Sequence, residues 1–128
     1  MTFVLVDTSV WVKHFRSGHP HLAHLLAQDQ VLMHPMVLGE IACGTPPDRL
    51  LTLKNLSLLR PMQVATVDEA IRFVETEQLF GYGYGCGLVD MLLLASTIIT
   101  PGAQLWSLDK RLSALADRFG VIYQPELH

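Results

Sequence analysis

Short apolar runs alternate along this chain with longer segments in which apolar residues recur every three or four positions. The short runs have the length of buried strands, which we predict at residues 2–6, 31–34, 62–65, 104–107 and 121–123. The longer segments predict helices at residues 8–16, 20–27, 35–43, 48–56, 66–80, 88–99 and 109–119. Apolar strands separated by helices are typical of a parallel sheet with helices on both faces. The pattern therefore predicts an α/β fold in a single domain, residues 1–128.

Local signals at the helix ends agree with this pattern. Thr8 or Ser9 is placed to cap the first helix, and Pro35 suits the first turn of the third. Thr66 and Glu69 form the sequence of a capping box at the start of the fifth helix. We therefore expect several helices to begin where their own sequence indicates.

Four acidic residues lie in apolar surroundings. Asp7 and Asp109 follow predicted strands, whereas Glu40 and Asp90 interrupt apolar helical segments. A buried carboxylate without a partner is costly, so it takes up a proton, an ion pair or a cation. The carboxyl ends of parallel strands share one edge of a sheet, where active sites of such folds lie. We therefore predict that the four acids converge on a divalent cation and that crowding raises the pKa of at least one.

Each acid taken alone also has a simpler interpretation. Asp7 and Asp109 suit helix caps, and Asp90 lies where a negative charge favours the helix dipole. Glu40 has no opposite charge four positions away on its predicted helix, so this alternative is weakest there. A shared cation site accounts for all four positions at once and is the interpretation that we adopt.

The charge balance changes once these acids are set aside. The net charge of −3 argues by itself against a nucleic-acid partner. The sequence has 12 Asp and Glu against 9 Lys and Arg, so removing the four acids leaves eight against nine. The overall charge therefore does not exclude a substrate that carries phosphates.

The cysteines and the apolar segments predict a cytoplasmic protein. Cys43 and Cys86 match neither a zinc site nor a disulfide framework, so we expect reduced thiols. The apolar run at residues 91–99 is too short to span a membrane. The N-terminal residues lack the basic region of a secretory signal.

The segments around the four acids resemble those of PIN-domain ribonucleases, especially the VapC-type toxins of bacterial toxin–antitoxin systems. The matching segments are Val6-Asp7-Thr8-Ser9-Val10-Trp11, His34-Pro35-Met36-Val37-Leu38-Gly39-Glu40-Ile41, Gly87-Leu88-Val89-Asp90-Met91-Leu92-Leu93-Leu94-Ala95 and Leu105-Trp106-Ser107-Leu108-Asp109-Lys110-Arg111-Leu112. Their order and spacing fit along the whole chain. The resemblance implies a PIN-like α/β/α sandwich with a short, mainly parallel central sheet.

The resemblance also implies an endoribonuclease that depends on Mg²⁺ or Mn²⁺. In such enzymes a metal-activated water hydrolyses an RNA phosphodiester bond. The implied catalytic residues and metal ligands, direct or through water, are Asp7, Glu40, Asp90 and Asp109. Ser107 matches a hydroxyl position at which threonine is common in the family, which is a mild departure. Thr8 and Ser9 are expected to orient Asp7 through hydrogen bonds, with an ordinary capping role as the alternative.

Other residues are weaker candidates for contact with RNA. The glycine- and tyrosine-rich segment 81–87 is predicted to be a connector, and base stacking by its tyrosines is the less favoured alternative. The histidines within residues 14–24 are predicted at surface or edge positions. Basic side chains flank the predicted site and are candidates for phosphate contacts, with solvated surface charge as the alternative: Lys13, Arg16, Lys110 and Arg111.

The resemblance implies a homodimer and a VapB-like antitoxin that inhibits the nuclease. An arginine of such a partner can bind two carboxylates at once and take the place of the cation. We predict that the antitoxin lies along the first two helices, around Trp11, Phe15 and residues 22–26.

Two other functions are compatible with parts of the pattern. A receiver-like phosphotransfer domain also has an acidic Mg²⁺ pocket, but it needs an adjacent acid pair after the first strand, where this chain has Asp7 alone. A catalytically inactive PIN-like module that binds RNA or protein is the other alternative, and the full set of four acids argues against it.

Overall fold

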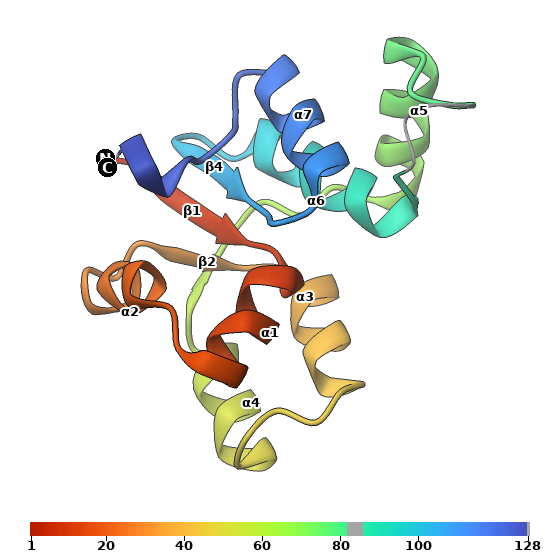
Figure 1. Cartoon of the computed structure of the whole chain (residues 1–128). Coiled ribbons are helices and arrows are strands. Elements are labelled where there is room, and N and C mark those ends of the chain that lie inside the picture. The colour runs from red at the N-terminus through yellow and green to blue at the C-terminus, as the bar shows by residue number, and fades with distance from the viewer. Residues whose placement is uncertain (82–85, 128) are drawn as a thin grey trace.

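A parallel sheet forms the centre of the computed structural model, which describes residues 1–81 and 86–127 (Figure 1). Its strands are β1 (Phe3–Val6), β2 (Val31–Met33), β3 (Arg60–Pro61) and β4 (Ala103–Trp106), in the spatial order β3-β2-β1-β4. Every neighbouring pair is parallel. The helices are α1 (Thr8–Ser17), α2 (Pro20–Ala27), α3 (Pro35–Ala42), α4 (Arg49–Ser57), α5 (Val67–Glu77), α6 (Leu88–Ile99) and α7 (Lys110–Arg118), with a short 3-10 helix η1 (Pro125–Leu127).

The strand order explains how the helices are distributed. The chain moves from β1 to β2 to β3 in one direction and then returns past β1 to β4. Because crossover connections are right-handed, this reversal places later helices on the opposite face. Figure 1 shows α1–α4 on one side of the strands and α5–α7 on the other. This arrangement confirms the predicted α/β/α sandwich. None of these helices, within the described residues, is long and apolar enough to cross a membrane.

The core lies against the central strands. Val4, Leu5 and Val6 of β1 have no exposed surface, and neither have Leu93 and Leu94 of α6. A strand with both neighbours paired and both faces covered must be apolar at every position, which is why β1 lacks the alternation of a half-exposed strand. Asp7 comes directly after this buried run, so the sheet itself delivers a carboxylate to its own edge.

Three predicted elements differ from the structure. The expected strand at 62–65 is absent, and β3 precedes it, because Gln63 and Ala65 donate their backbone N–H groups to hydroxyls of Thr100 and Ser96. The expected strand at 121–123 is a single parallel bridge between Leu105 and Ile122. The fifth helix ends at Glu77 rather than at residue 80. The predicted connector at 81–87 lies partly outside the described residues, because 82–85 are not described.

A buried histidine joins the helices that carry Glu40 and Asp90. His34 is 1% exposed, and its Nδ1 accepts a hydrogen bond from the Met36 backbone N–H at 3.0 Å, which caps α3. The neutral ring therefore carries its hydrogen on Nε2, which donates to Ser96 Oγ of α6 at 3.0 Å. Burial lowers the pKa of His34. This side chain fixes the start of α3 against α6 as long as it stays neutral.

We expect acid to destabilise the protein through His34. Because its pKa is lower in the folded chain, the unfolded chain binds the proton first as the pH falls below about 6.5. The free energy of unfolding then falls with a slope of at most about 1.4 kcal/mol per pH unit for this one proton. Urea titrations between pH 7.5 and 5 measure the slope. His34→Gln reduces the slope of the unfolding free energy with pH, whereas His24→Gln, on the exposed side of α2, keeps the slope of the native protein. Equal slopes for the two variants would contradict this account.

Candidate active site

Asp7 lies at the junction of β1 and α1, with its carboxylate held by three donors. Its Oδ1 accepts from the Thr8 backbone N–H at 2.8 Å, and its Oδ2 accepts from Ser9 Oγ at 2.9 Å and Ser107 Oγ at 2.7 Å. Asp7 is 7% exposed and is itself the N-cap of α1. The predicted cap at Thr8 or Ser9 is therefore wrong, because Asp7 is the last residue with an extended backbone.

Ser107 links Asp7 to the fourth acid. Its hydroxyl donates to Asp7 and accepts from the Asp109 backbone N–H at 3.0 Å. Asp109 caps α7, because its Oδ1 accepts from the backbone N–H groups of Arg111 at 2.8 Å and Leu112 at 3.0 Å. This cap leaves Oδ2 of Asp109 without a hydrogen bond among the described residues. The simpler interpretation of Asp109 is thus correct, and the same side chain still presents an oxygen to solvent.

Glu40 reaches the site from α3. It is exposed, and its Oε1 accepts a hydrogen bond from Thr8 Oγ1 at 2.8 Å. Thr8 therefore contacts two acids, through its backbone at Asp7 and through its hydroxyl at Glu40. The sequence predicted a contact of Thr8 with Asp7 but not one with Glu40. Thr8 and Glu40 are 32 positions apart in the sequence, and the packing of α1 against α3 brings them into contact.

Asp90, in the first turn of α6, shows that the four acids form one electrostatic cluster. Burial raises its pKa most, and the negative charges of Asp7, Asp109 and Glu40 raise it further, against a hydrogen bond from the Gly87 backbone that lowers it. The prediction that crowding raises the pKa of at least one of these carboxylates is confirmed. Because each of the other three charges acts on Asp90, all four acids lie at the same edge of the sheet.

This edge is the point at which the strand order reverses. Asp7 follows β1 and Asp109 follows β4, and these strands are neighbours although they are far apart in the sequence. In open α/β sheets, ligands bind beyond the carboxyl ends of the strands where neighbouring connections diverge to opposite faces. These two acids therefore lie where ligands bind in open α/β sheets.

The donor set fits a hydrated Mg²⁺ better than a closed metal cage. Among the described residues, ion pairs join Arg60 to Asp29 and Arg118 to Glu77, and neither involves the cluster. In residues 1–81 and 86–127, no three His, Cys, Asp or Glu side chains lie close enough together to coordinate one metal ion directly. Mg²⁺ keeps several waters and takes one or two carboxylates directly. Four unpaired carboxylates, loosely arranged, are compatible with that mode of binding.

Comparison with known proteins agrees with this architecture. A model of the PIN domain matches residues 4–118. The chain belongs to the PIN-domain family. It is also 40% identical over 124 residues to ribonuclease VapC32 of Mycobacterium tuberculosis, strains CDC 1551 / Oshkosh and ATCC 25618 / H37Rv, and the match covers 97% of this chain and 98% of each relative. The predicted resemblance to the VapC type of PIN domain is confirmed.

The basic residues predicted near the site of this PIN domain lie on α1 and α7, the helices that follow Asp7 and Asp109. Arg16 lines a pocket together with Glu40. The charge of Arg111 acts on Cys86, close to two of the acids, and the charge of Lys13 acts on His19. All four basic side chains, Lys110 included, are exposed, and none of them pairs with an acid of the cluster within the described part of the chain.

Cys86 is a neighbour of the site that the sequence did not indicate. Its pKa is raised to about 11, first by burial and then by the negative charges of Asp90 and Asp109. The thiol is therefore protonated and inert at neutral pH, as predicted for a reduced cysteine. The sequence offered only one signal for this position, the spacing of four residues between Cys86 and Asp90. That spacing becomes informative once Asp90 is known to belong to the cluster.

An apolar pocket of about 470 Å³ lies between α1 and α3 beside the acids. Val12, Phe15, Ile41 and Pro46 contribute to its wall, and Thr8, Arg16, Glu40, Gly44, Thr45 and Pro47 complete it. The sequence placed a partner groove around Trp11, Phe15 and residues 22–26. Trp11, Leu22 and Leu25 are 1%, 0% and 3% exposed and belong to the core, so they offer no surface to a partner, whereas Phe15 also lines this pocket.

We expect Asp90→Asn to stabilise the PIN domain at neutral pH. The raised pKa means that folded Asp90 holds its proton more tightly than the unfolded chain, so its contribution to stability falls as the pH rises above about 3.8. The amide removes a half-buried charge that three carboxylates repel. Thermal unfolding at pH 7.5 without metal should show a rise of roughly 3–5 °C.

Asp7→Asn provides the contrast. An amide nitrogen cannot accept from a hydroxyl, so one of the bonds to Asp7 is lost and the variant unfolds at a lower temperature than native protein. An equal shift for both variants would mean that charge repulsion alone, without the three donors to Asp7, describes the site.

Proposed function

We propose that this chain, residues 1–128, is one PIN domain that acts as a metal-dependent endoribonuclease, the toxin of a toxin–antitoxin pair in the cytoplasm. The proposal rests on one observation: the charges of Asp7, Glu40 and Asp109 all act on Asp90 at the edge where the strand order reverses. A crowded cluster of carboxylates without basic partners favours the binding of a cation. The name of its 40% identical relative, a ribonuclease, supports RNA as the substrate.

The side chains around the cluster have separable roles in this proposal. Bound Mg²⁺ or Mn²⁺, held directly or through water by Asp7, Glu40, Asp90 and Asp109, supplies an acidified water and neutralises phosphate charge. Ser9 and Ser107 donate to Asp7 Oδ2 and so direct its remaining lone pairs.

Thr8 and the basic residues support the same chemistry from outside the cluster. Thr8 donates to Glu40 Oε1, which leaves Oε2 free to face the cation. Exposed cations around the cluster hold the phosphates on either side of the bond that is cut: Lys13, Arg16, Lys110 and Arg111. These contacts position the RNA backbone but do not read its sequence.

We further propose a homodimer and a VapB-like antitoxin that binds the pocket between α1 and α3. The pocket offers apolar side chains next to Glu40, so one segment of a partner fills the pocket and places an arginine on the carboxylates. An arginine there excludes the cation by charge. Inhibition and anchoring are thus two parts of one binding event.

Cleavage of RNA tests the proposed activity. Purified native protein with Mg²⁺ cuts a mixed-sequence RNA, chelation stops the cut, and Asp7→Asn and Asp90→Asn lower the rate by at least roughly 100-fold, as expected for loss of charged groups at the reacting centre. Asp117→Asn on the exposed side of α7 is the matched control and keeps the native rate.

The same samples give a readout that does not depend on activity. Mg²⁺ at 100 times its dissociation constant should add about 2.7 kcal/mol to the stability of native protein and less to that of Asp90→Asn. Native cleavage in the presence of excess chelator, or cleavage by Asp90→Asn at the control's rate, would rule out the proposed mechanism.

A charge in the apolar pocket tests the partner. Val12 is 37% exposed in this pocket, so Val12→Glu weakens binding of the antitoxin encoded beside this chain, by at least roughly tenfold, without unfolding the domain. Val64→Glu introduces the same charge at a position 46% exposed and outside the pocket. Calorimetry with both variants separates the two effects. Equal affinities for them would place the antitoxin elsewhere.

A further inference from the structure

A second cleft, of about 480 Å³, is lined in part by Ser107, the residue that donates to Asp7. Its lining includes His19, Trp106, Leu108, Tyr123, Gln124 and Glu126. The volume is within the range of pockets that bind small molecules, roughly 300–1,000 Å³. Apart from Ser107, none of the residues that line this cleft has a role in the function proposed above.

Ser107 places the cleft next to the site of cleavage. Its hydroxyl donates to Asp7, while its backbone carbonyl accepts from Ser113 Oγ at 3.0 Å, and Ser113 lines the cleft. Leu108, the next residue, donates its backbone N–H to Ser9 Oγ at 3.0 Å and also lines the cleft. Ser107 and Leu108 therefore connect the surroundings of Asp7 directly to the lining of the cleft.

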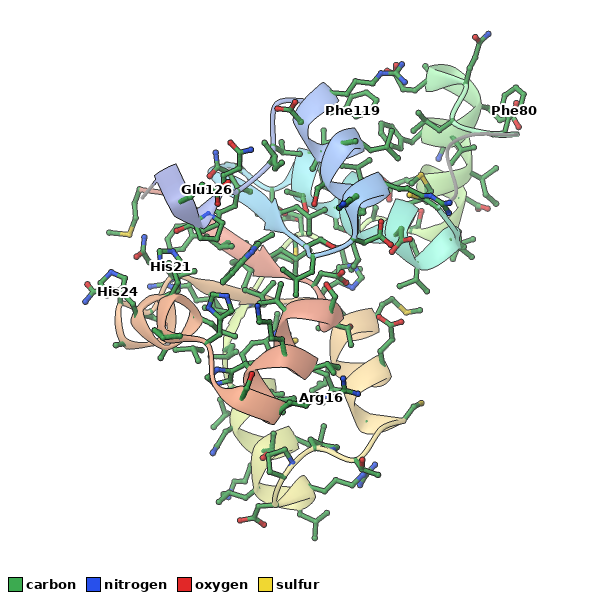
Figure 2. All side chains as sticks on the ribbon, in the orientation of Figure 1. Arg16, His21, His24, Phe80, Phe119 and Glu126 are labelled. Atoms are coloured by element: carbon green, nitrogen blue, oxygen red, sulfur yellow. The ribbon has the colours of Figure 1, made fainter. Side chains whose placement is uncertain are left out.

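The floor of the cleft is a rigid group of rings. Trp106 lies edge-on to His19, with ring centroids 4.9 Å apart, and its centroid is 6.0 Å from that of Tyr123. A hydrogen bond of 2.7 Å joins Tyr123 Oη to His21 Nε2. Trp106 and Tyr123 are 3% and 5% exposed, so neighbouring atoms fix their orientation. Figure 2 shows His21 and Glu126 on the same side of the molecule, on α2 and η1. Such a floor needs no rearrangement to receive a flat apolar ligand.

The polar groups of the cleft have a definite sign. Glu126 is an exposed carboxylate that forms no ion pair among the described residues, and Gln124 adds an amide. A carboxylate repels phosphate and accepts hydrogen bonds, so the interior favours a neutral ligand that presents N–H donors. Lys13 is exposed, and its positive charge helps to lower the pKa of His19 in the wall, after the larger effect of burial. An apolar floor, an accepting carboxylate and a cation outside match a nucleotide whose base points inward.

We propose that this cleft binds a guanine base of the RNA beside the bond that is cut, with the Glu126 carboxylate accepting from guanine N1–H and N2–H₂. Guanine is the base whose edge offers two adjacent donors, which a carboxylate binds bidentately. Leu108, 45% exposed, and Ile122 supply the apolar sides against which the base packs. The inference rests on the proposed function for the presence of RNA, and it assigns that function a sequence preference.

Binding of single nucleotides tests the cleft without cleavage. We expect GMP to bind native protein at least about tenfold more tightly than AMP, CMP or UMP, in chelating buffer that removes any cation from the acids. The indole N–H signal of Trp106 in NMR spectra shifts on titration with GMP, whereas that of Trp11, in the core, does not.

Variants separate this inference from the proposed function. Glu126→Gln loses at least about tenfold in affinity for GMP, and the matched control Glu75→Gln on α5 binds as native protein does. On RNAs that differ by one guanine beside the cut, Glu126→Gln cuts both equally while native protein prefers guanine. Equal binding of the four nucleotides, or an unchanged affinity in Glu126→Gln, overturns the guanine site whether or not the protein cuts RNA. Normal GMP binding without metal-dependent cleavage instead overturns the proposed nuclease and leaves the guanine site standing.

Discussion

The carboxylate of Asp7 is the contact on which the rest of the site depends. It ends the most buried strand, caps α1 and accepts from hydroxyls on two different connections, those after β1 and after β4. Ser107, which donates to Asp7, also accepts a hydrogen bond from the Asp109 backbone, and Thr8, whose backbone donates to Asp7, also donates its hydroxyl to Glu40. Because one side chain joins neighbouring strands that are about 100 residues apart, the cluster exists only when the parallel sheet is complete.

The cost of the cluster falls on Asp90. Asp90 lies half-buried in the first turn of an apolar helix and is repelled by the other three acids, and its hydrogen bond from the Gly87 backbone does not offset these effects. Burial and the neighbouring negative charges together raise the pKa of Asp90. Stability and function are opposed here, since any change that relieves the repulsion also removes the reason for a cation to bind.

Function in this fold is divided among surfaces that meet at one edge. The apolar pocket between α1 and α3 adjoins Glu40, and the cleft over Trp106 adjoins Ser107, so the cluster has a neighbour on each side. The pocket favours an apolar segment of a partner, and the cleft favours a flat base with N–H donors. The two proposed binding surfaces therefore suit ligands of different chemistry.

The sequence by itself determined the elements and the four acids. An uninterrupted apolar run specified β1, and an apolar segment interrupted by Asp90 specified α6. A capping box specified the start of α5, and an acid beside an apolar run marked each site position. Tertiary structure decided the strand at 60–61 in place of 62–65, the partner of Thr8, the core positions of Trp11 and Leu22, and both clefts. The reason is that periodicity and capping act over a few residues, whereas these features depend on which distant groups compete for the same donor or the same space. Ala65 donates to Ser96 instead of to a strand, and Thr8 donates to Glu40, only because α6 and α3 pack where the strand order places them.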